Sequence, residues 1–186
     1  MFRELLAREF APHGDLSLAQ LEQLESHYEL LLRWNAKLNL TRMDSIEEAT
    51  RLHYCESLFL GQRLPKDPLR IVDVGSGAGF PGIPIAILRP ECSVALIESH
   101  KRKGVFLSEA IRSLVNAKVV TDRAENLQGE FDWMISRAVS PSAVLRLNLA
   151  NNLAMLVGAN DAALFQNSEL LPWGERRHLV FHVKHP

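Results

Sequence analysis

The stretch that decides the fold is Ile71-Val72-Asp73-Val74-Gly75-Ser76-Gly77-Ala78-Gly79. Its first four residues are typical of a buried strand, and a helix is predicted soon after it, over residues 82–89. Three alternating glycines weaken a regular element, but they let the backbone come close to a ligand. A glycine-rich turn between a strand and a helix is therefore a candidate binding site. We expect a ligand to lie against Gly75, Gly77 and Gly79.

Two classes of cofactor bind at such a turn, nicotinamide dinucleotides and S-adenosylmethionine. The dinucleotide pattern G-x-G-x-x-G requires a third glycine where this sequence has Phe80. Asp73 would crowd a pyrophosphate, whereas it can help to hold an ammonium and a sulfonium, directly or through water. Both features favour S-adenosylmethionine, although Asp73 could also simply cap the next helix. Glu98, after the next strand, can accept hydrogen bonds from both ribose hydroxyls, or it can simply cap the next helix. Because nicotinamide enzymes have an acidic residue at the same place, Glu98 does not distinguish the two cofactors.

Downstream of the turn, short apolar runs alternate with helical segments. Strands are predicted over residues 69–74, 94–97, 118–121, 131–136, 162–165 and 178–183, and helices over residues 82–89, 101–115 and 141–157. The alternation predicts a doubly wound, mostly parallel sheet with helices on both faces, which is a Rossmann-like α/β fold. Ligands of such sheets bind at the carboxyl ends of the strands.

Two amphipathic helices are predicted ahead of the sheet. Apolar residues recur at helical spacing from Leu18 onward, and Asp15 or Ser17 can cap that helix. Ser45 followed by Glu48 forms a capping-box pattern, which predicts a second helix that runs to about residue 60.

One domain is expected for a chain of 186 residues, of which 47% are hydrophobic and 23% charged. Residues 61–68 are rich in helix breakers, and we interpret them as a connector. Residues 1–60 are then an N-terminal helical extension, and residues 69–186 form the cofactor-binding α/β core. The two parts together make a single domain over residues 1–186.

Charge and cysteine content exclude several classes of protein. The net charge of -1 gives no global basic excess, so any contact with RNA must be local. Cys55 and Cys92 lack the spacing of a zinc or redox pair, and His178 and His182 are too far apart along a strand to share a metal. The first ten residues are too charged for a signal peptide, and no apolar run is long enough to cross a bilayer. We expect a cytoplasmic protein that binds no metal and no membrane.

These motifs, taken together, resemble the RsmG or GidB family, the small-subunit ribosomal RNA guanine-N7 methyltransferases. The resemblance covers nearly the whole chain and is densest at residues 73–84, where Gly-Phe-Pro-Gly-Ile-Pro continues the glycine turn. The other matching segments are residues 34–41, 53–58, 98–99, 101–103, 106–107, 123–125, 131–132, 135–138 and 174–180. The resemblance implies a class I methyltransferase fold, S-adenosylmethionine as cofactor, and small-subunit ribosomal RNA or a ribosomal particle as partner. We expect a monomer.

The resemblance also implies roles for single residues. Gly75 and Phe80 would line the cofactor, Ala124 and Glu125 would flank its adenine, and Arg137 would lie near the methyl group. The full cofactor-binding set is then Asp73, Gly75, Gly77, Gly79, Phe80, Glu98, Ser99, Ala124, Glu125 and Arg137. Arg137 and Arg123 are the candidate catalytic residues, because either guanidinium could hold an RNA phosphate or the guanine O6 edge. Each could instead form an ion pair at a strand end.

The sequence departs from the family near its end, where the family has a longer segment between its fifth strand and its closing motif, including a Lys-Gly pair near the end of that strand. Residues 165–167 are Phe-Gln-Asn at that place, and only a few residues separate them from Gly174. A second hypothesis is therefore a catalytically impaired S-adenosylmethionine-binding protein that docks on RNA or another partner. The basic run at residues 101–103 is a candidate phosphate-binding patch, or else a solvated helix face. A nicotinamide oxidoreductase is disfavoured by Asp73 and Phe80.

Overall fold

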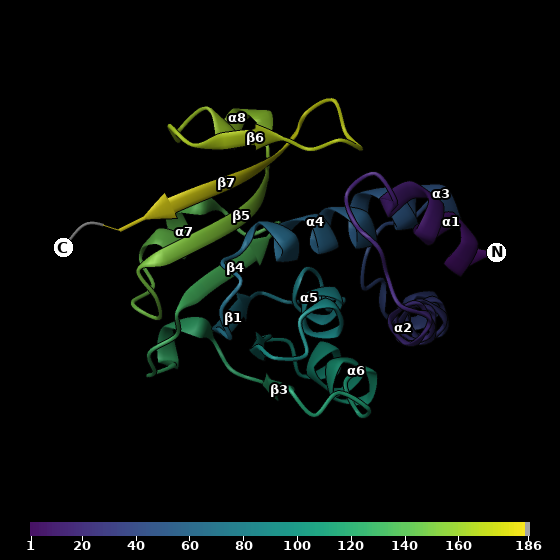
Figure 1. The fold of residues 1–186 in the computed structure, drawn as a ribbon. Coiled ribbons are helices and arrows are strands. Elements are labelled where there is room, and N and C mark those ends of the chain that lie inside the picture. Colours follow the sequence, from purple (N-terminus) through teal and green to yellow (C-terminus); the bar gives the residue numbers. More distant parts are fainter. Residues whose placement is uncertain (185–186) are drawn as a thin grey trace.

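A computed structural model describes residues 1–184 and contains one seven-stranded sheet (Figure 1). The sheet has the order β3-β2-β1-β4-β5-β7-β6. Its first five strands are parallel, and β7 runs antiparallel between β5 and β6, which confirms the predicted mostly parallel α/β sheet. The six-stranded dinucleotide fold instead places its sixth strand directly beside the fifth. The strands are β1 (Arg70–Val74), β2 (Ser93–Ile97), β3 (Ala117–Val120), β4 (Trp133–Arg137), β5 (Asn152–Gly158), β6 (Ser168–Leu170) and β7 (Arg177–Val183).

Of the helices before β1, α1, α2 and α3 gather at one end of the molecule, beyond α5 and α6, whereas α4 lies beside α5 and reaches β5 (Figure 1). Ser17 caps the second of them, and its side chain and that of Gln20 form a reciprocal capping box. Ser45 also caps its helix, but the Glu48 carboxylate accepts from the Asp44 N–H, so only half of the predicted box forms. The helices are α1 (Phe2–Phe10), α2 (Leu18–Leu38), α3 (Ile46–Glu48), the π-helix η1 (Ala49–Cys55), α4 (Glu56–Arg63), α5 (Gly82–Leu88), α6 (Lys101–Ala110), the 3-10 helix η2 (Ala124–Asn126), α7 (Pro141–Leu145) and α8 (Ala159–Ala162). No helix within residues 1–184 is both long and apolar enough to span a membrane.

The two faces of the sheet are covered differently. Alternate residues of each strand point to opposite faces, so Ala154 and Leu156 of β5 join one apolar core while Leu153 and Met155 join the other. The first core includes residues of α1, α2, η1 and α4 to α6. The second core is closed by α7, by the residues that follow it and by α8. The N-terminal helices therefore add to only one face.

The predicted helix over residues 141–157 and the predicted strand over residues 162–165 are wrong. The chain makes only the short helix α7 before Asn152 starts β5, and residues 159–162 form α8. β5 lies between β4 and β7 and is buried on both faces, so its apolar run does not alternate and has the same pattern as a buried helix. Helix α6 also ends at Ala110, before the predicted residue 115.

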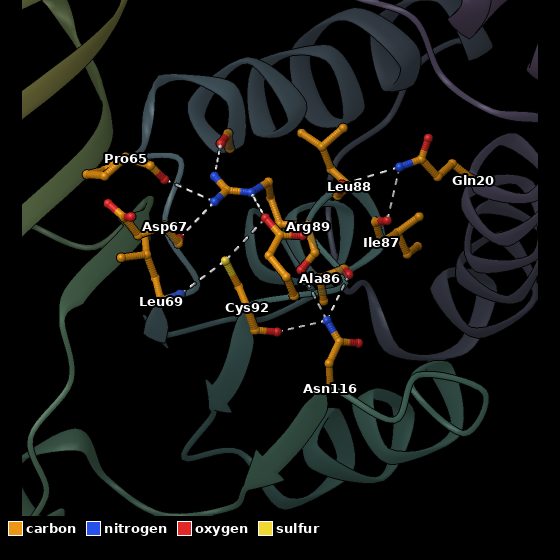
Figure 2. A network of polar contacts seen from close by, with 12 residues as sticks. Gln20, Pro65, Asp67, Leu69, Ala86, Ile87, Leu88, Arg89, Cys92 and Asn116 are labelled. Carbon is orange, nitrogen blue, oxygen red and sulfur yellow. Dashed lines mark hydrogen bonds and ion pairs between the residues drawn. The ribbon is translucent and has the colours of Figure 1, made fainter.

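Helix α4 runs on to Arg63, so the predicted connector over residues 61–68 is reduced to residues 64–68, and a network of polar contacts fixes this part of the chain to the core (Figure 2). The buried Arg89 guanidinium donates to the carbonyls of Gly61, Pro65 and Asp67. The Asn116 amide donates to the Ala86 and Cys92 carbonyls, and Gln20 donates to the Ile87 and Leu88 carbonyls. The last carbonyls of α5, which have no partner within the helix, are thereby satisfied. The start of α2 is held against the end of α5 by the same contacts.

Candidate functional site

The glycine turn takes a backbone conformation that only glycine adopts easily. The φ angles of Gly75, Gly77 and Gly79 are 72°, 56° and 86°. A Cβ atom on Gly75 would also lie 2.7 Å from Val139 Cγ2. The turn is held to the next strand, because the N–H groups of Gly75 and Ser76 both donate to the Ile97 carbonyl. It is therefore a rigid feature of this fold.

Asp73 lies fully buried beneath this turn. Its Oδ2 accepts a hydrogen bond from the Gly82 N–H at 3.0 Å, which caps α5, while its buried Oδ1 has no partner among the described residues. Burial raises the pKa of Asp73 to about 7, and the negative charge of Glu98 contributes. The capping interpretation thus holds for one oxygen. The other oxygen lacks the hydrogen bond that a buried polar atom normally has, so it can accept one from a ligand.

Glu98 joins the glycine turn to the start of α6. Its Oε2 accepts from the Gly77 N–H at 3.0 Å, and its Oε1 accepts from the His100 N–H at 2.8 Å. Both oxygens have a further lone pair, so the carboxylate can accept two ribose hydroxyls without losing these bonds. Its backbone partners hold it in a fixed orientation.

The N-terminal helices reach the turn through a buried chain of hydrogen bonds. His27 of α2 donates from Nε2 to the Ala78 carbonyl at 3.1 Å, and its Nδ1 accepts from the Tyr54 hydroxyl at 2.8 Å. Burial lowers the pKa of His27 to about 4, so the ring is neutral at pH 7. Phe80 packs edge-on against both rings and stacks on His53, with ring centroids 5.1 Å apart.

Arg137, at the end of β4, belongs to a second, partly buried cluster. Its guanidinium lies 5.8 Å from the Phe80 ring centroid, and its buried Nη1 has no partner in the described part of the chain. Burial lowers the pKa of Arg137 to about 10, so it stays charged at pH 7. Close by, Arg177 forms a bidentate ion pair with the fully buried Glu56, at 2.6 and 2.7 Å. Among residues 1–184, Arg137 therefore does not form the strand-end ion pair that was its alternative.

Three hollows follow one another along the carboxyl ends of the parallel strands. The first, of about 320 Å³, is lined by Gly75, Ser99 and the loop over residues 122–125. The second, of about 240 Å³, also contains Gly75 and continues to Glu98 and Arg137. The third, of about 260 Å³, shares Arg137 and Ala138 with the second. One larger opening, of about 410 Å³, lies at the amino ends of the strands, away from these groups.

Most of the predicted site residues line this row of hollows. Gly75, Ser99, Arg123, Ala124 and Glu125 line the first hollow, and Gly75, Gly77, Phe80, Glu98 and Arg137 line the second. Asp73 and Gly79 line neither of them. Arg123 and Arg137 do not share a hollow, so the structure does not bring the two candidate catalytic residues together. Lys103, from the basic run, lines the second hollow.

Sequence reasoning assigned no role to His27, Tyr54, Glu56 or Arg177. The segments that carry the family resemblance include Tyr54, Glu56 and Arg177. Their place in these segments was therefore the one signal in the sequence that could have drawn attention to them. Their partners are 27 to 121 residues away, a separation that no local pattern reveals. Within residues 1–184, no three His, Cys, Asp or Glu side chains group in a way that could hold a metal ion.

Comparison with known proteins gives a consistent result. The family model of GidB, described as rRNA small subunit methyltransferase G, matches residues 20–160. A Chromobacterium violaceum protein named ribosomal RNA small subunit methyltransferase G is 42% identical over 86% of this chain and 79% of its own length. A Lachnoclostridium phytofermentans protein of the same name is 39% identical over 70% of this chain and 58% of its own length. The chain thus spans between 58% and 79% of these two relatives.

Solved structures with low identity share the fold. A methyltransferase from Aquifex aeolicus, titled as S-adenosylmethionine dependent, has a TM-score of 0.58 at 14% identity, over 73% of this chain and 92% of its own. Aeropyrum pernix fibrillarin, solved with natively bound S-adenosyl-L-methionine, has a TM-score of 0.52 at 15% identity, over 69% and 73%. These similarities establish the architecture.

Proposed function

The chain belongs to the GidB family, the rRNA small subunit methyltransferases G, and we propose that it transfers a methyl group from S-adenosylmethionine to a guanine N7 of small-subunit ribosomal RNA. The observation that carries this proposal is the buried, unpartnered Oδ1 of Asp73 beneath a glycine turn that accepts no side chain at Gly75. A buried acceptor of this kind suits a cationic ligand, whereas it would repel a pyrophosphate.

The residues of the first two hollows fit S-adenosylmethionine. Ser99, Ala124 and Glu125 would surround the adenine in the first hollow, and Glu98 would accept the ribose hydroxyls at its boundary. Asp73 lines neither hollow, so it would act on the ammonium end through a bridging water and through its negative charge. When bound, this cofactor supplies a methyl group that is activated by attachment to a sulfonium.

The chain's own residues have a positioning task in this reaction. Guanine N7 carries a lone pair and no proton, so no general base is needed. The two histidines near the site are consistent with a reaction that needs no general base. Burial lowers the pKa of His53 to about 3 and that of His27 to about 4, so neither takes up a proton at pH 7. Arg137, between the second and third hollows, would orient the base, and correct orientation alone can remove roughly 7 to 11 kcal/mol of barrier in favourable cases.

Transfer of radiolabel from S-adenosylmethionine into small-subunit RNA or particles tests the proposal. We expect the wild type to label RNA and Arg137→Ala to abolish the labelling. The exposed Arg112, in the turn that follows α6, gives a matched control, and Arg112→Ala should retain activity. Tight cofactor binding without transfer to any RNA would refute the enzymatic activity.

The end of β5 favours a second candidate, a cofactor-binding protein that docks on RNA without catalysis. The structure ends this strand at Gly158, so the place of the family's Lys-Gly pair falls at residues 157–158 and not at residues 165–167 as the sequence suggested. The glycine of that pair is present, whereas the buried Val157 stands where the lysine is expected. The same labelling assay separates the two candidates.

A further inference from the structure

The third hollow lies where a methyl acceptor would have to sit. It borders the second hollow through Arg137 and Ala138, and its walls come from the ends of β4 and β5, from α8 and from β7. Apolar side chains of Leu156 and Val157 form part of its lining, and the polar groups are those of Arg137, Ser140, Asp161 and Arg177. At about 260 Å³ it is smaller than the roughly 300 to 1,000 Å³ typical of drug-sized ligands. It suits a flat ring system of one base.

The charges around this hollow balance. Two guanidinium groups, those of Arg137 and Arg177, face two carboxylates, because Glu56 pairs with Arg177 and Asp161 lines the opening. His53, which is close to Arg137, is neutral at pH 7 because burial lowers its pKa to about 3. A phosphate would need an excess of positive charge here. A balanced site fits instead an uncharged ligand that both accepts and donates hydrogen bonds.

Two polar groups of the hollow are free to bind such a ligand. The Asp161 carboxylate is exposed on α8 and has no side-chain partner within residues 1–184. The Arg137 guanidinium makes no hydrogen bond or ion pair to a described residue, while Arg177 is already occupied by Glu56. One free donor group and one free acceptor group therefore line the same small hollow.

We propose that the third hollow binds the guanine base itself, with Arg137 donating to O6 and Asp161 accepting from N1–H and the 2-amino group. This assignment rests on the proposed function. It leaves N7, which neighbours O6, directed toward the second hollow and its methyl donor. Adenine has a donor in place of O6 and an acceptor in place of N1–H, so both contacts would be lost or repulsive. The hollow thus selects guanine over adenine.

A substrate that lacks one hydrogen-bonding group tests the role of Asp161. The methylated guanine is first mapped by nuclease digestion and mass spectrometry, and a synthetic RNA is made with inosine, which lacks the 2-amino group, at that position. The wild type should lose about tenfold or more in kcat/KM on the inosine RNA, because one hydrogen bond to a carboxylate is missing. Asp161→Ala should lose at least that factor on the guanosine RNA, because it removes the partner of both N1–H and the 2-amino group, and it should then treat both RNAs alike. If Asp161→Ala keeps the wild-type ratio between the two RNAs, the assignment is wrong.

Two controls separate the failure of this assignment from the failure of the proposed function. Asp67→Ala removes an exposed acid at the amino end of the sheet and should behave as the wild type. Titration calorimetry with guanosine and adenosine 5′-monophosphates, in the presence of S-adenosylhomocysteine, gives a readout without transfer. A preference for the guanine nucleotide that disappears in Asp161→Ala supports the assignment even if no RNA is methylated. Equal binding of both nucleotides, or no binding, overturns it.

Discussion

The glycine turn contacts two regions that are built differently. On the side of the N-terminal helices, His27, Tyr54 and Glu56 are buried and hydrogen-bonded. On the side of the first hollow, the loop over residues 122–125 is largely exposed. Buried polar groups are costly to leave unpaired, so the first region resists change and fixes the position of the turn. The exposed loop contributes recognition and little rigidity.

The largest effect is expected at the buried ion pair. Glu56→Ala should lower the free energy of unfolding by about 3 to 5 kcal/mol, because it leaves Arg177 without its partner and next to Arg137. Chemical denaturation measures this loss. Glu169→Ala breaks the exposed ion pair with Arg63 and should cost less than about 1 kcal/mol. If Glu56→Ala and Glu169→Ala lose similar amounts of unfolding free energy, the buried region resists change no more than the exposed one.

Asp73 gives the next largest effect. Asp73→Asn should weaken cofactor binding by about 10- to 100-fold at pH 8, because it removes a buried negative charge beneath the turn that would hold the cationic ligand. Calorimetric titration checks this value. Because burial raises the pKa of Asp73 to about 7, wild-type affinity should rise between pH 6 and pH 8, whereas that of Asp73→Asn should stay flat. An equal pH dependence in both proteins would contradict the assignment.

The same raised pKa affects stability without cofactor. Asp73 binds a proton more tightly in the folded state, with a pKa of about 7, than in the unfolded state, with the ordinary 3.8. The contribution of this proton binding to the free energy of unfolding is therefore fully present below about pH 4. It is lost as the pH rises to 7, the pKa of Asp73 in the folded state. Thermal unfolding of wild type and Asp73→Asn across this range should show the difference, because the pH dependence that the buried His27 and His53 contribute is common to both proteins and cancels.

Tyr54→Phe should have a smaller effect. It removes the hydroxyl that donates to His27 Nδ1 and leaves that buried nitrogen without a partner, at a cost of about 1 to 2 kcal/mol in the free energy of unfolding. Tyr28 offers a matched control, since its hydroxyl makes no hydrogen bond in the described structure. If Tyr28→Phe and Tyr54→Phe are equally stable, the link from α2 to the turn contributes nothing.

The smallest effect is expected in the exposed loop. Glu125→Ala should weaken cofactor binding by only about two- to fivefold, because solvent screens an exposed carboxylate and the first hollow keeps its other walls. Competition against a fluorescent cofactor analogue can resolve such a change. A loss of cofactor affinity above about 50-fold would show that the exposed loop is as sensitive to substitution as the buried region.

The sequence by itself determined the strand, glycine turn and helix around Asp73, and the placement of Glu98 after the next strand. These features depend on local rules, namely the positive φ that only glycine adopts readily and the pattern of a buried strand. Only the tertiary structure decided that residues 152–158 form a strand, because their burial between β4 and β7 overrides their helical pattern. It also decided the contacts of Glu56 with Arg177 and of His27 with Ala78, since these partners are 121 and 51 residues apart and only packing brings them together.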